Sequence, residues 1–577
     1  MRCQKSGLVM NPIKLKTYLV VAPFFLMTTL CCDTGFGQDE YRAASEKVDQ
    51  IFSKLNKPDS PGAAVVVLKN GVIVHKRGYG MANIEKGTPN TPSTIMEVGS
   101  VAKQFTAFAI ALLVDQKKLS LDEDIRTYIP EVPNFGDKIT VRHLIHHTSG
   151  LRNWEVLFKL TGYNGTMDSK RAIQMVKQQK ELNFKPGEEY SYCNTGYLLL
   201  AEVVERVSNQ TFREWTRINI FDPLEMKNTS FQDDPSKIDL KGTHGYFMDE
   251  NGDFKQNGYG WAVPGPTSLF TTAEDLTQWM RNFDEPQLGA LASIELMLQK
   301  GVLNNGSELN YAFGLEIANY KGIQKISHEG GWAGFRSVIV LYPGQNFGVV
   351  VLSNMGLGIF NPMPYANQIA DIYLTHQFSE IESPPVKSVK VNPNRYDSYI
   401  GKYILPLPYS KPILVTIMKE KNRLLGQIEG QSKGELIPQS ETIFRVKDED
   451  IQLIFSSDEN GRFNHFVPLI DGGKKLLPAR KLNKLNVDKM EEFTGDFRSP
   501  ELSTTWQISI LDNQLLAKHK LQKSVRLLST GADRFTGDQW WFQEIVFERD
   551  NKGRITGFRL TAEDGLVRKL AFTKQNE

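Results

Sequence analysis

The sequence predicts an α+β domain followed by two small antiparallel β-barrel units. In the first 378 residues, an amphipathic helix and a β-hairpin precede a long helical region, and strands and a closing helix follow that region. Beyond residue 392 the pattern changes to short strands separated by turns, and it occurs twice. A chain of 577 residues is also too long for a single hydrophobic core, so several domains are expected.

The first domain is expected to span residues 38–378. Apolar residues spaced three and four apart predict a helix over 39–57. Two β-branched runs flank Asn70-Gly71, the dipeptide that favours a two-residue hairpin turn. Because the order is helix, strands, a large helical insertion, strands and helix, we expect the terminal helices to pack on one antiparallel sheet with a helical subdomain beside it. Strands are expected at 311–317 and 335–353, and helices at 141–147, 169–181, 196–208, 211–219, 273–284 and 364–375.

A linker rich in Ser, Pro, Val and Glu is expected at residues 379–392. After it, the motif at 399–403 (YIGKY) returns at 493–497 (FTGDF), and the turn signal around Gly461 returns around Gly553. The two repeats predict homologous barrel units at 393–482 and 483–577, each the size of a small up-and-down barrel.

Residues 1–37 have the features of a secretory signal peptide. A basic segment with Lys14 and Lys16 precedes a 13-residue apolar stretch, which is too short to span a bilayer comfortably. We expect cleavage before Gln38 and a secreted or periplasmic protein with no stable membrane span. Lipoprotein anchoring at Cys31 or Cys32 is a less favoured alternative, and an uncleaved anchor ranks third. The mature chain keeps Cys193 alone, so an internal disulfide is not possible.

Composition and charge limit the classes of partner that this protein is expected to bind. The net charge is +2, and the leader accounts for more than that, so the mature chain is near neutral and offers no electrostatic surface for nucleic acid. The expected partner is a small-molecule or peptide substrate, and the oligomeric state stays open. No motif indicates a cofactor or a metal: His143, His146 and His147 lack ligand-spaced carboxylates and are expected to be structural.

The first chemical motif is Gly99-Ser100-Val101-Ala102-Lys103. A Ser and a Lys three apart at a helix start lie one turn apart on the same face. An amine whose pKa is depressed by burial can take the serine proton, and outward-pointing helix amides favour a developing oxyanion. Alone the pattern is weak, because it equally fits a helix cap and a surface lysine.

Two further motifs can complete such a site. Tyr192-Cys193-Asn194 supplies a phenol that can share proton transfer and a carboxamide that can bind a substrate amide. The strand His328-Glu329-Gly330-Gly331 can lie against a substrate because its glycines have no Cβ, and the Gly331 amide can join that of Ser100 as an oxyanion donor. Each motif alone also fits an ordinary strand end or turn.

In this order the three motifs resemble the S-x-x-K, Y-x-N and H-x-G elements of the serine β-lactamase and DD-peptidase superfamily, specifically its class C-like branch of penicillin-binding protein-like enzymes. The resemblance covers about residues 45–378 and implies a beta-lactamase/transpeptidase-like fold. It extends to ITVRHLIHHTSGL at 139–151, FDPLEMKNTSF at 221–231, FTTAEDLTQW at 270–279 and HEGGWAGFRS at 328–337.

The resemblance also implies roles. Ser100 is acylated, Lys103 is the general base, and Tyr192 is coupled to it, protonates the leaving group and activates the deacylating water. Whether Lys103 or Tyr192 takes the serine proton stays open. Asn194 contacts the substrate amide, and His328 orients Tyr192 or the substrate.

The third motif shapes the expected substrate. His328 stands where β-lactamases and many DD-peptidases carry Lys, and a neutral His offers a substrate carboxylate less positive charge. H-x-G is similar to D-aminopeptidases, esterases and archaeal peptidases of the superfamily. We therefore expect a serine hydrolase of D-amino-acid peptidase or esterase type, acting on an amide, peptide or ester. A β-lactamase and a non-catalytic protein that binds peptidoglycan fragments or a partner are the alternatives.

The C-terminal repeats look like the lipocalin-like barrels of such D-aminopeptidases, in which one barrel loop limits substrate access. A gating role and a plain spacer or dimerisation role are both open for them.

Overall fold

A computed structural model describes residues 38–575 apart from 239–241, 250, 259, 290, 380–388, 390, 408–411, 458–460, 471–473, 484–486 and 563–564. The expected signal peptide at 1–37, with Cys3, Cys31 and Cys32, and most of the expected linker at 379–392 lie outside the described residues. By its contacts the chain divides after Ala43, and residues 44–577 make up one compact unit.

A six-stranded antiparallel sheet organises the first domain, in the order β12-β13-β14-β15-β1-β2. Ala63 lies opposite Ser353, so the first hairpin of the domain pairs with the last. The β1–β2 turn places Asn70 and Gly71 at φ +50° and +72°, as the Asn-Gly dipeptide predicts. The strands are β1 Ala63–Lys69, β2 Val72–Tyr79, β12 Glu316–Tyr320, β13 Ile323–Trp332, β14 Phe335–Tyr342 and β15 Phe347–Ser353.

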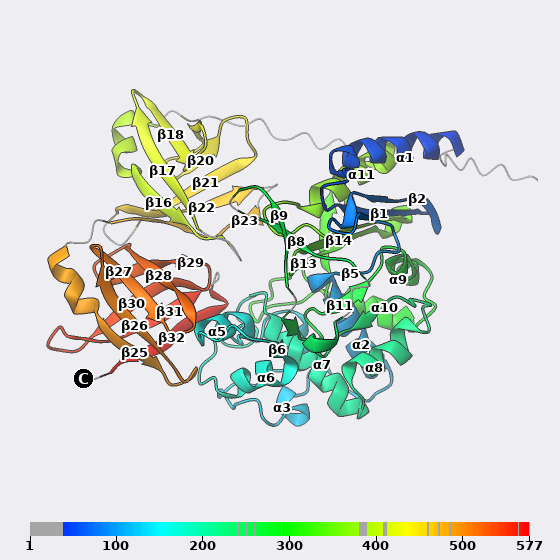
Figure 1. Ribbon diagram of the computed structural model, residues 1–577, viewed down its shortest axis with the longest axis horizontal. Coiled ribbons are helices and arrows are strands. Elements are labelled where there is room, and N and C mark those ends of the chain that lie inside the picture. The colour runs from blue at the N-terminus through cyan, green and yellow to red at the C-terminus, as the bar shows by residue number, and fades with distance from the viewer. Residues whose placement is uncertain are drawn as a thin grey trace, which may run out of the picture. The chain divides into compact units, whose positions relative to one another are not determined.

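Helices pack against this sheet and against one another beside it (Figure 1). α11 lies on β14 and β15, and Phe52 of α1 stacks on Tyr79 of β2. The apolar helix α2, which the site uses, packs against α7 and α10 and is buried along nearly its whole length. The helices are α1 Gln38–Phe52, α2 Ala102–Asp115, α3 Ile125–Tyr128, α4 Val141–Ile145, α5 Trp154–Leu160, α6 Ser169–Lys177, α7 Asn194–Ser208, α8 Phe212–Thr216, α9 Asp275–Asp284, α10 Leu291–Met297 and α11 Pro362–Leu374.

Short strands complete the domain. β5 pairs with β11, and β11 pairs with β7, which makes a small three-stranded sheet. β5 ends at Glu97, shortly before Ser100 in the chain. These strands are β3 Met81–Asn83, β4 Thr88–Pro89, β5 Met96–Glu97, β6 Met167–Asp168, β7 Ser230–Phe231, β8 Tyr246–Met248, β9 Phe254–Gln256, β10 Trp261–Ala262 and β11 Leu269–Thr271.

Several expected bounds differ from the structure: the helix expected at 39–57 ends as an α-helix at Phe52, the helix expected at 169–181 ends at Lys177, and two further elements differ as follows. The strand expected at 311–317 begins only at Glu316, because Gly314 adopts φ +69° and the preceding residues form a turn against α2. A side chain at Gly314 would meet the Lys103 backbone at 2.7 Å, so this turn is tightly packed there. The helix expected at 211–219 ends as an α-helix at Thr216 and continues as one π-helical turn over Arg217–Phe221.

Two antiparallel barrels follow, as the internal repeat predicts. In the first, β21 pairs with both β20 and β22, which closes the sheet, and β23 adds to β22. The second is a closed barrel of β25 to β32 in sequence order. The strands are β16 Gly401–Leu405, β17 Ile413–Glu420, β18 Arg423–Ile428, β19 Lys433–Pro438, β20 Ile443–Val446, β21 Ile451–Ser457, β22 Phe463–Ile470, β23 Lys474–Lys475, β24 Ala479–Lys481, β25 Gly495–Ser499, β26 Thr504–Leu511, β27 Gln514–His519, β28 Gln522–Ser529, β29 Arg534–Gln539, β30 Phe542–Arg549, β31 Ile555–Ala562 and β32 Val567–Lys574.

The cores of the two barrels differ. The first barrel has its own core, filled by aromatic side chains that include Tyr399, Phe444 and Phe455. The core of the second barrel is continuous with that of the first domain, and the indole nitrogen of Trp506 donates to the carbonyl of Leu160 at 2.9 Å. Trp541 and Phe542 belong to this core. The second barrel is therefore packed into the first domain, while the first barrel is built around its own apolar interior.

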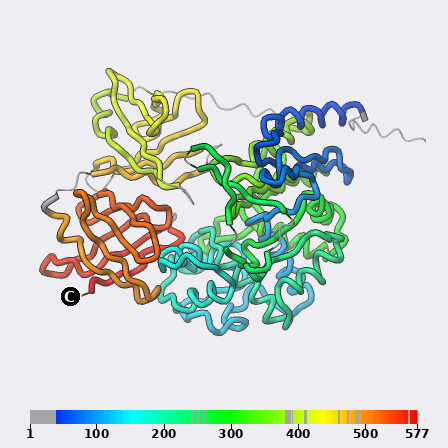
Figure 2. The backbone as a smooth tube through the Cα atoms, viewed as in Figure 1, coloured from blue at the N-terminus to red at the C-terminus, as the bar shows by residue number. Residues whose placement is uncertain are grey.

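No helix in the described part of the chain is long and apolar enough to cross a membrane. The backbone tube in Figure 2 follows the chain through both barrels after the first domain.

Candidate active site

Ser100 lies in a short 3-10 turn, Gly99–Val101, that leads directly into α2. The end of strand β13 approaches this turn closely. A side chain on Gly99, which has φ +51°, would meet the Gly331 nitrogen at 2.4 Å, and one on Gly330 would meet the Val98 carbonyl oxygen at 2.0 Å. The backbones of the first and third motifs therefore touch, which is possible only because glycine occupies these positions.

Lys103 is fully buried one helical turn beyond Ser100. Its Nζ lies 2.9 Å from Ser100 Oγ and donates to the Pro266 carbonyl at 3.0 Å. Burial lowers the pKa of Lys103 to about 7, and the charge of Glu155 acts in the opposite direction. At neutral pH a substantial fraction of this amine is therefore unprotonated and able to accept a proton.

Tyr192 covers the amine from the other side. The Lys103 Nζ lies 4.8 Å from the centroid of the Tyr192 ring and 2.9 Å from Ser100 Oγ, so the lysine stands between the phenol and the hydroxyl. Burial raises the pKa of this phenol well above its usual value, and its interaction with Ser100 opposes the shift. Tyr192 therefore keeps its proton when Lys103 loses one, so the two groups are suited to opposite roles.

Asn194 is the first residue of α7, and its side chain is buried. Among the described residues its Oδ1 has no hydrogen-bond partner. Because a buried amide oxygen without a partner is costly, this atom is available to an N–H group brought by a ligand.

His328 lies on β13, buried beside the lysine. Its Nδ1 lies 2.6 Å from the Glu329 carbonyl oxygen, and its Nε2 lies 3.2 Å from the hydroxyl of Tyr311. A ring that donates from Nδ1 and accepts at Nε2 is neutral. Burial, together with the charge of Lys103, lowers the pKa of His328 to about 3, so it carries no positive charge at neutral pH.

The sequence did not reveal Tyr311. It stands in the stretch expected to be a strand, and no spacing links it to the other motifs. Its ring lies among those of Tyr192 and His147, at centroid distances of 6.2 and 4.7 Å. Only the fold brings this turn to the site, so sequence pattern alone offers no signal for it.

The other candidates from the sequence have structural partners. His143 accepts from the Thr140 amide, and His146 is hydrogen-bonded to two backbone carbonyls. The Cys193 thiol is buried and donates to the Leu151 carbonyl at 3.3 Å, and burial raises its pKa to about 11. Cys193 is therefore a protonated thiol and a poor nucleophile. Within the described residues, no three His, Cys, Asp or Glu side chains gather in an arrangement that could hold a metal.

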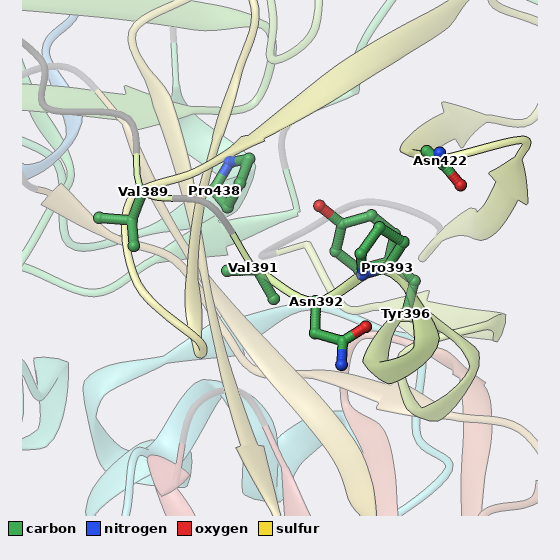
Figure 3. A pocket seen from close by; sticks show the side chains of 7 residues that line it. All are labelled: Val389, Val391, Asn392, Pro393, Tyr396, Asn422 and Pro438. Carbon is green, nitrogen blue, oxygen red and sulfur yellow. The ribbon is translucent and has the colours of Figure 1, made fainter.

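A hollow on the first barrel is a separate candidate (Figure 3). The figure shows the ring of Tyr396 beside Pro393, with Asn422 on a hairpin across from them. Its lining carries no charged side chain, and among its residues only the phenol of Tyr396 can titrate. Acyl-transfer chemistry needs an activated nucleophile, so this hollow does not compete with Ser100. Its lining residues are Val389, Val391, Asn392, Pro393, Tyr396, Asn422 and Pro438.

Comparison with known proteins gives consistent matches. A family model described as Beta-lactamase matches residues 48–369. A penicillin-binding protein of Bacillus subtilis (strain 168) is 25% identical over 443 residues, which cover 74% of this chain and 96% of that protein. A D-aminopeptidase of Gluconobacter oxydans (strain 621H) is 28% identical over 348 residues, 59% of this chain and 63% of that protein. The octameric penicillin-binding protein homologue from Pyrococcus abyssi shares the fold, with a TM-score of 0.55 at 22% identity over 84% of this chain and 99% of that one.

Proposed function

The chain belongs to the beta-lactamase family of serine hydrolases, and from that premise we propose that it cleaves an amide, peptide or ester through an acyl-enzyme formed on Ser100. The observation that carries the proposal is the pair of Ser100 and Lys103. The 2.9 Å contact joins the nucleophile to an amine whose pKa burial lowers to about 7. A base that is half deprotonated at neutral pH is matched to the task of removing a hydroxyl proton.

Acylation begins when neutral Lys103 accepts the hydroxyl proton of Ser100. The Ser100 oxygen then forms a bond to the substrate carbonyl carbon, and the carbonyl oxygen takes up the negative charge. The amides of Ser100 and Gly331 are the proposed oxyanion donors, because the two backbones are in contact. Collapse of this intermediate breaks the bond to the leaving group.

Tyr192 is the proposed donor to that leaving group. Its raised pKa keeps the phenol protonated, and its ring lies 4.8 Å from Lys103 Nζ, which contacts Ser100 Oγ, so the phenol is beside the reacting atoms. The proton held by Lys103 then restores the phenol. In deacylation the same groups work in reverse. A water loses its proton to them as its oxygen bonds to the ester carbonyl carbon; the bond from that carbon to the Ser100 oxygen then breaks, Ser100 takes the proton back, and the acid product leaves.

The side chains proposed to contact the substrate favour some classes of hydrolase over others. The free Oδ1 of Asn194 suits a substrate N–H. Neutral His328, with its Nε2 engaged by Tyr311, offers no fixed positive charge for a carboxylate next to the scissile bond. This favours an esterase or a D-amino-acid peptidase over a β-lactamase, and a relative bearing the name D-aminopeptidase agrees with it.

A substrate panel tests the proposal. Nitrocefin, D-alanine p-nitroanilide, short-chain p-nitrophenyl esters and D-Ala-D-Ala peptides are offered to the wild type, Ser100→Ala and Lys103→Ala. We expect turnover of an ester or a D-aminoacyl amide that both variants lose. Turnover of nitrocefin alone favours the β-lactamase alternative. No turnover of any substrate, with equal labelling of wild type and Ser100→Ala by a fluorophosphonate, favours a binding protein without catalysis.

The leader expected at residues 1–37 extends the proposal to location: the enzyme is exported, with cleavage before Gln38. N-terminal sequencing of the mature protein tests this. An N-terminus that starts at an acylated Cys31 or Cys32 supports the lipoprotein alternative instead.

A further inference from the structure

His147 holds the chain on both sides of Tyr192. The backbone amide of Ser191 donates to the carbonyl of His147 at 2.9 Å, and the amide of Cys193 donates to its Nδ1 at 3.0 Å. The imidazole also packs on the phenol between these two contacts, with ring centroids 4.3 Å apart. One residue therefore fixes the residues before and after Tyr192 and the face of its ring.

The conformation of His147 makes this possible. It lies just after α4 with φ +58°, in the left-handed region, which turns its carbonyl and its side chain toward the same segment. Non-glycine residues adopt this region at a cost, and Asn does so most readily. A strained residue fully buried beside a catalytic group indicates that the surroundings hold it there for a purpose.

The imidazole is also held in one protonation state. Because Nδ1 accepts from the Cys193 amide, the ring proton lies on Nε2. Burial, together with the charge of Lys103, lowers the pKa of His147 well below its usual value. The ring thus stays neutral over the pH range in which Lys103 titrates, and Nδ1 remains a hydrogen-bond acceptor throughout that range.

The segment that carries Tyr192 needs such support. Residues 190–193 form no helix or strand, and they precede α7, which begins at Asn194. Beyond the two contacts to His147, this segment is held by a hydrogen bond that the thiol of Cys193 donates to the Leu151 carbonyl. The phenol must lie within hydrogen-bond distance of Ser100, and a shift of about 1 Å in a reacting group can cost a factor of about 100 in rate.

We infer that His147 is a positioning residue, which acts through Tyr192 by fixing its backbone and ring against Ser100. The inference rests on the proposed function, because it assumes that Tyr192 transfers a proton. It goes further by assigning the second His of the HHTSG stretch to the catalytic phenol. Its neighbour His146 points its nitrogens to the carbonyls of Arg142 and Gln299 and makes no such contact.

A double-mutant cycle tests this. His147→Gly accepts the positive φ but removes the ring acceptor, whereas His147→Asn accepts the φ and keeps an oxygen close to the position of Nδ1. Each is made with Tyr192 and with Tyr192→Phe, and kcat and KM are measured with a p-nitrophenyl ester. His146→Asn is the matched control for a buried histidine that lies away from Tyr192.

We expect His147→Gly to lower kcat by about 10- to 100-fold with KM changed less than about 3-fold. His147→Asn should recover most of that loss. With Tyr192→Phe, the glycine substitution should cost less than about 3-fold, because the group it positions is already gone. His146→Asn should lower the melting temperature while leaving kcat within about 3-fold in both backgrounds.

Equal losses of kcat in the two backgrounds, or an Asn variant as impaired as the Gly variant, would overturn the inference while leaving the proposed function intact. A Tyr192→Phe enzyme with wild-type kcat would remove the role of the phenol, and the inference with it. Should circular dichroism show His147→Gly to be unfolded at the assay temperature, all variants are measured at a lower temperature at which it is folded, with the same outcomes.

Discussion

Acidification should switch this enzyme off through Lys103. With a pKa of about 7, half of this amine is neutral at pH 7, about a tenth at pH 6 and about a hundredth at pH 5. A lysine with its usual pKa of 10.5 would be neutral to only about 0.03% at pH 7. If neutral Lys103 is the base, kcat/KM should fall about tenfold per pH unit below pH 6 and level off above pH 8.

The assay is the initial rate of p-nitrophenyl ester hydrolysis from pH 5 to 9, read where nitrophenol and nitrophenolate absorb equally. Circular dichroism at each pH separates titration from unfolding. Lys103→Arg is the matched control, because a guanidinium stays protonated at every pH used. A flat profile, a midpoint above pH 9, or an active Lys103→Arg enzyme would refute the assignment of Lys103 as the base.

Three further predictions concern stability, measured by chemical denaturation. Burial raises the pKa of Glu97 from 4.5 to about 8, so the folded state holds an extra proton between these values and loses stability as pH rises through that window. From pH 5 to 8 the free energy of unfolding of Glu97→Gln should therefore rise relative to that of the wild type, by at most about 5 kcal/mol. Glu501→Gln removes the buried carboxylate that lies 2.8 Å from the buried guanidinium of Arg152 and should lower the free energy of unfolding by about 3 kcal/mol. Glu181→Gln removes an exposed carboxylate from the same guanidinium and should cost under about 1 kcal/mol; equal costs would contradict this. Asn354→Ala removes five hydrogen bonds to four segments and should cost about 3 kcal/mol or more, and a loss under about 1 kcal/mol would contradict the account.

Local patterns predicted much of this molecule. Asn70-Gly71 marked the first hairpin because few other dipeptides adopt positive φ at both positions. The order of Ser100, Tyr192 and His328 predicted the candidate site, because each supplies a part that the nucleophile needs. The internal repeat predicted two barrels, and the structure confirms both.

Contacts between distant segments were not predictable in the same way. Tyr311 reaches His328 from a turn that the sequence predicts as a strand, and only the tight packing of Gly314 on α2 shows why the strand starts later. His147 was expected to be structural, and its hydrogen bonds to the Tyr192 segment could not be foreseen because they depend on how two loops meet. The core of the second barrel is continuous with that of the first domain because two distant surfaces fit together, and no local sequence pattern describes such a fit.

Intact-protein mass spectrometry during turnover shows directly whether Ser100 is the residue that becomes acylated. The enzyme is mixed with a p-nitrophenyl ester, quenched in acid within the first turnovers, and mapped by peptide digestion. We expect a single added acyl mass on the peptide that carries Ser100, absent from Ser100→Ala. An acyl group on the peptide that carries Cys193, or turnover by Ser100→Ala at the wild-type rate, would contradict it.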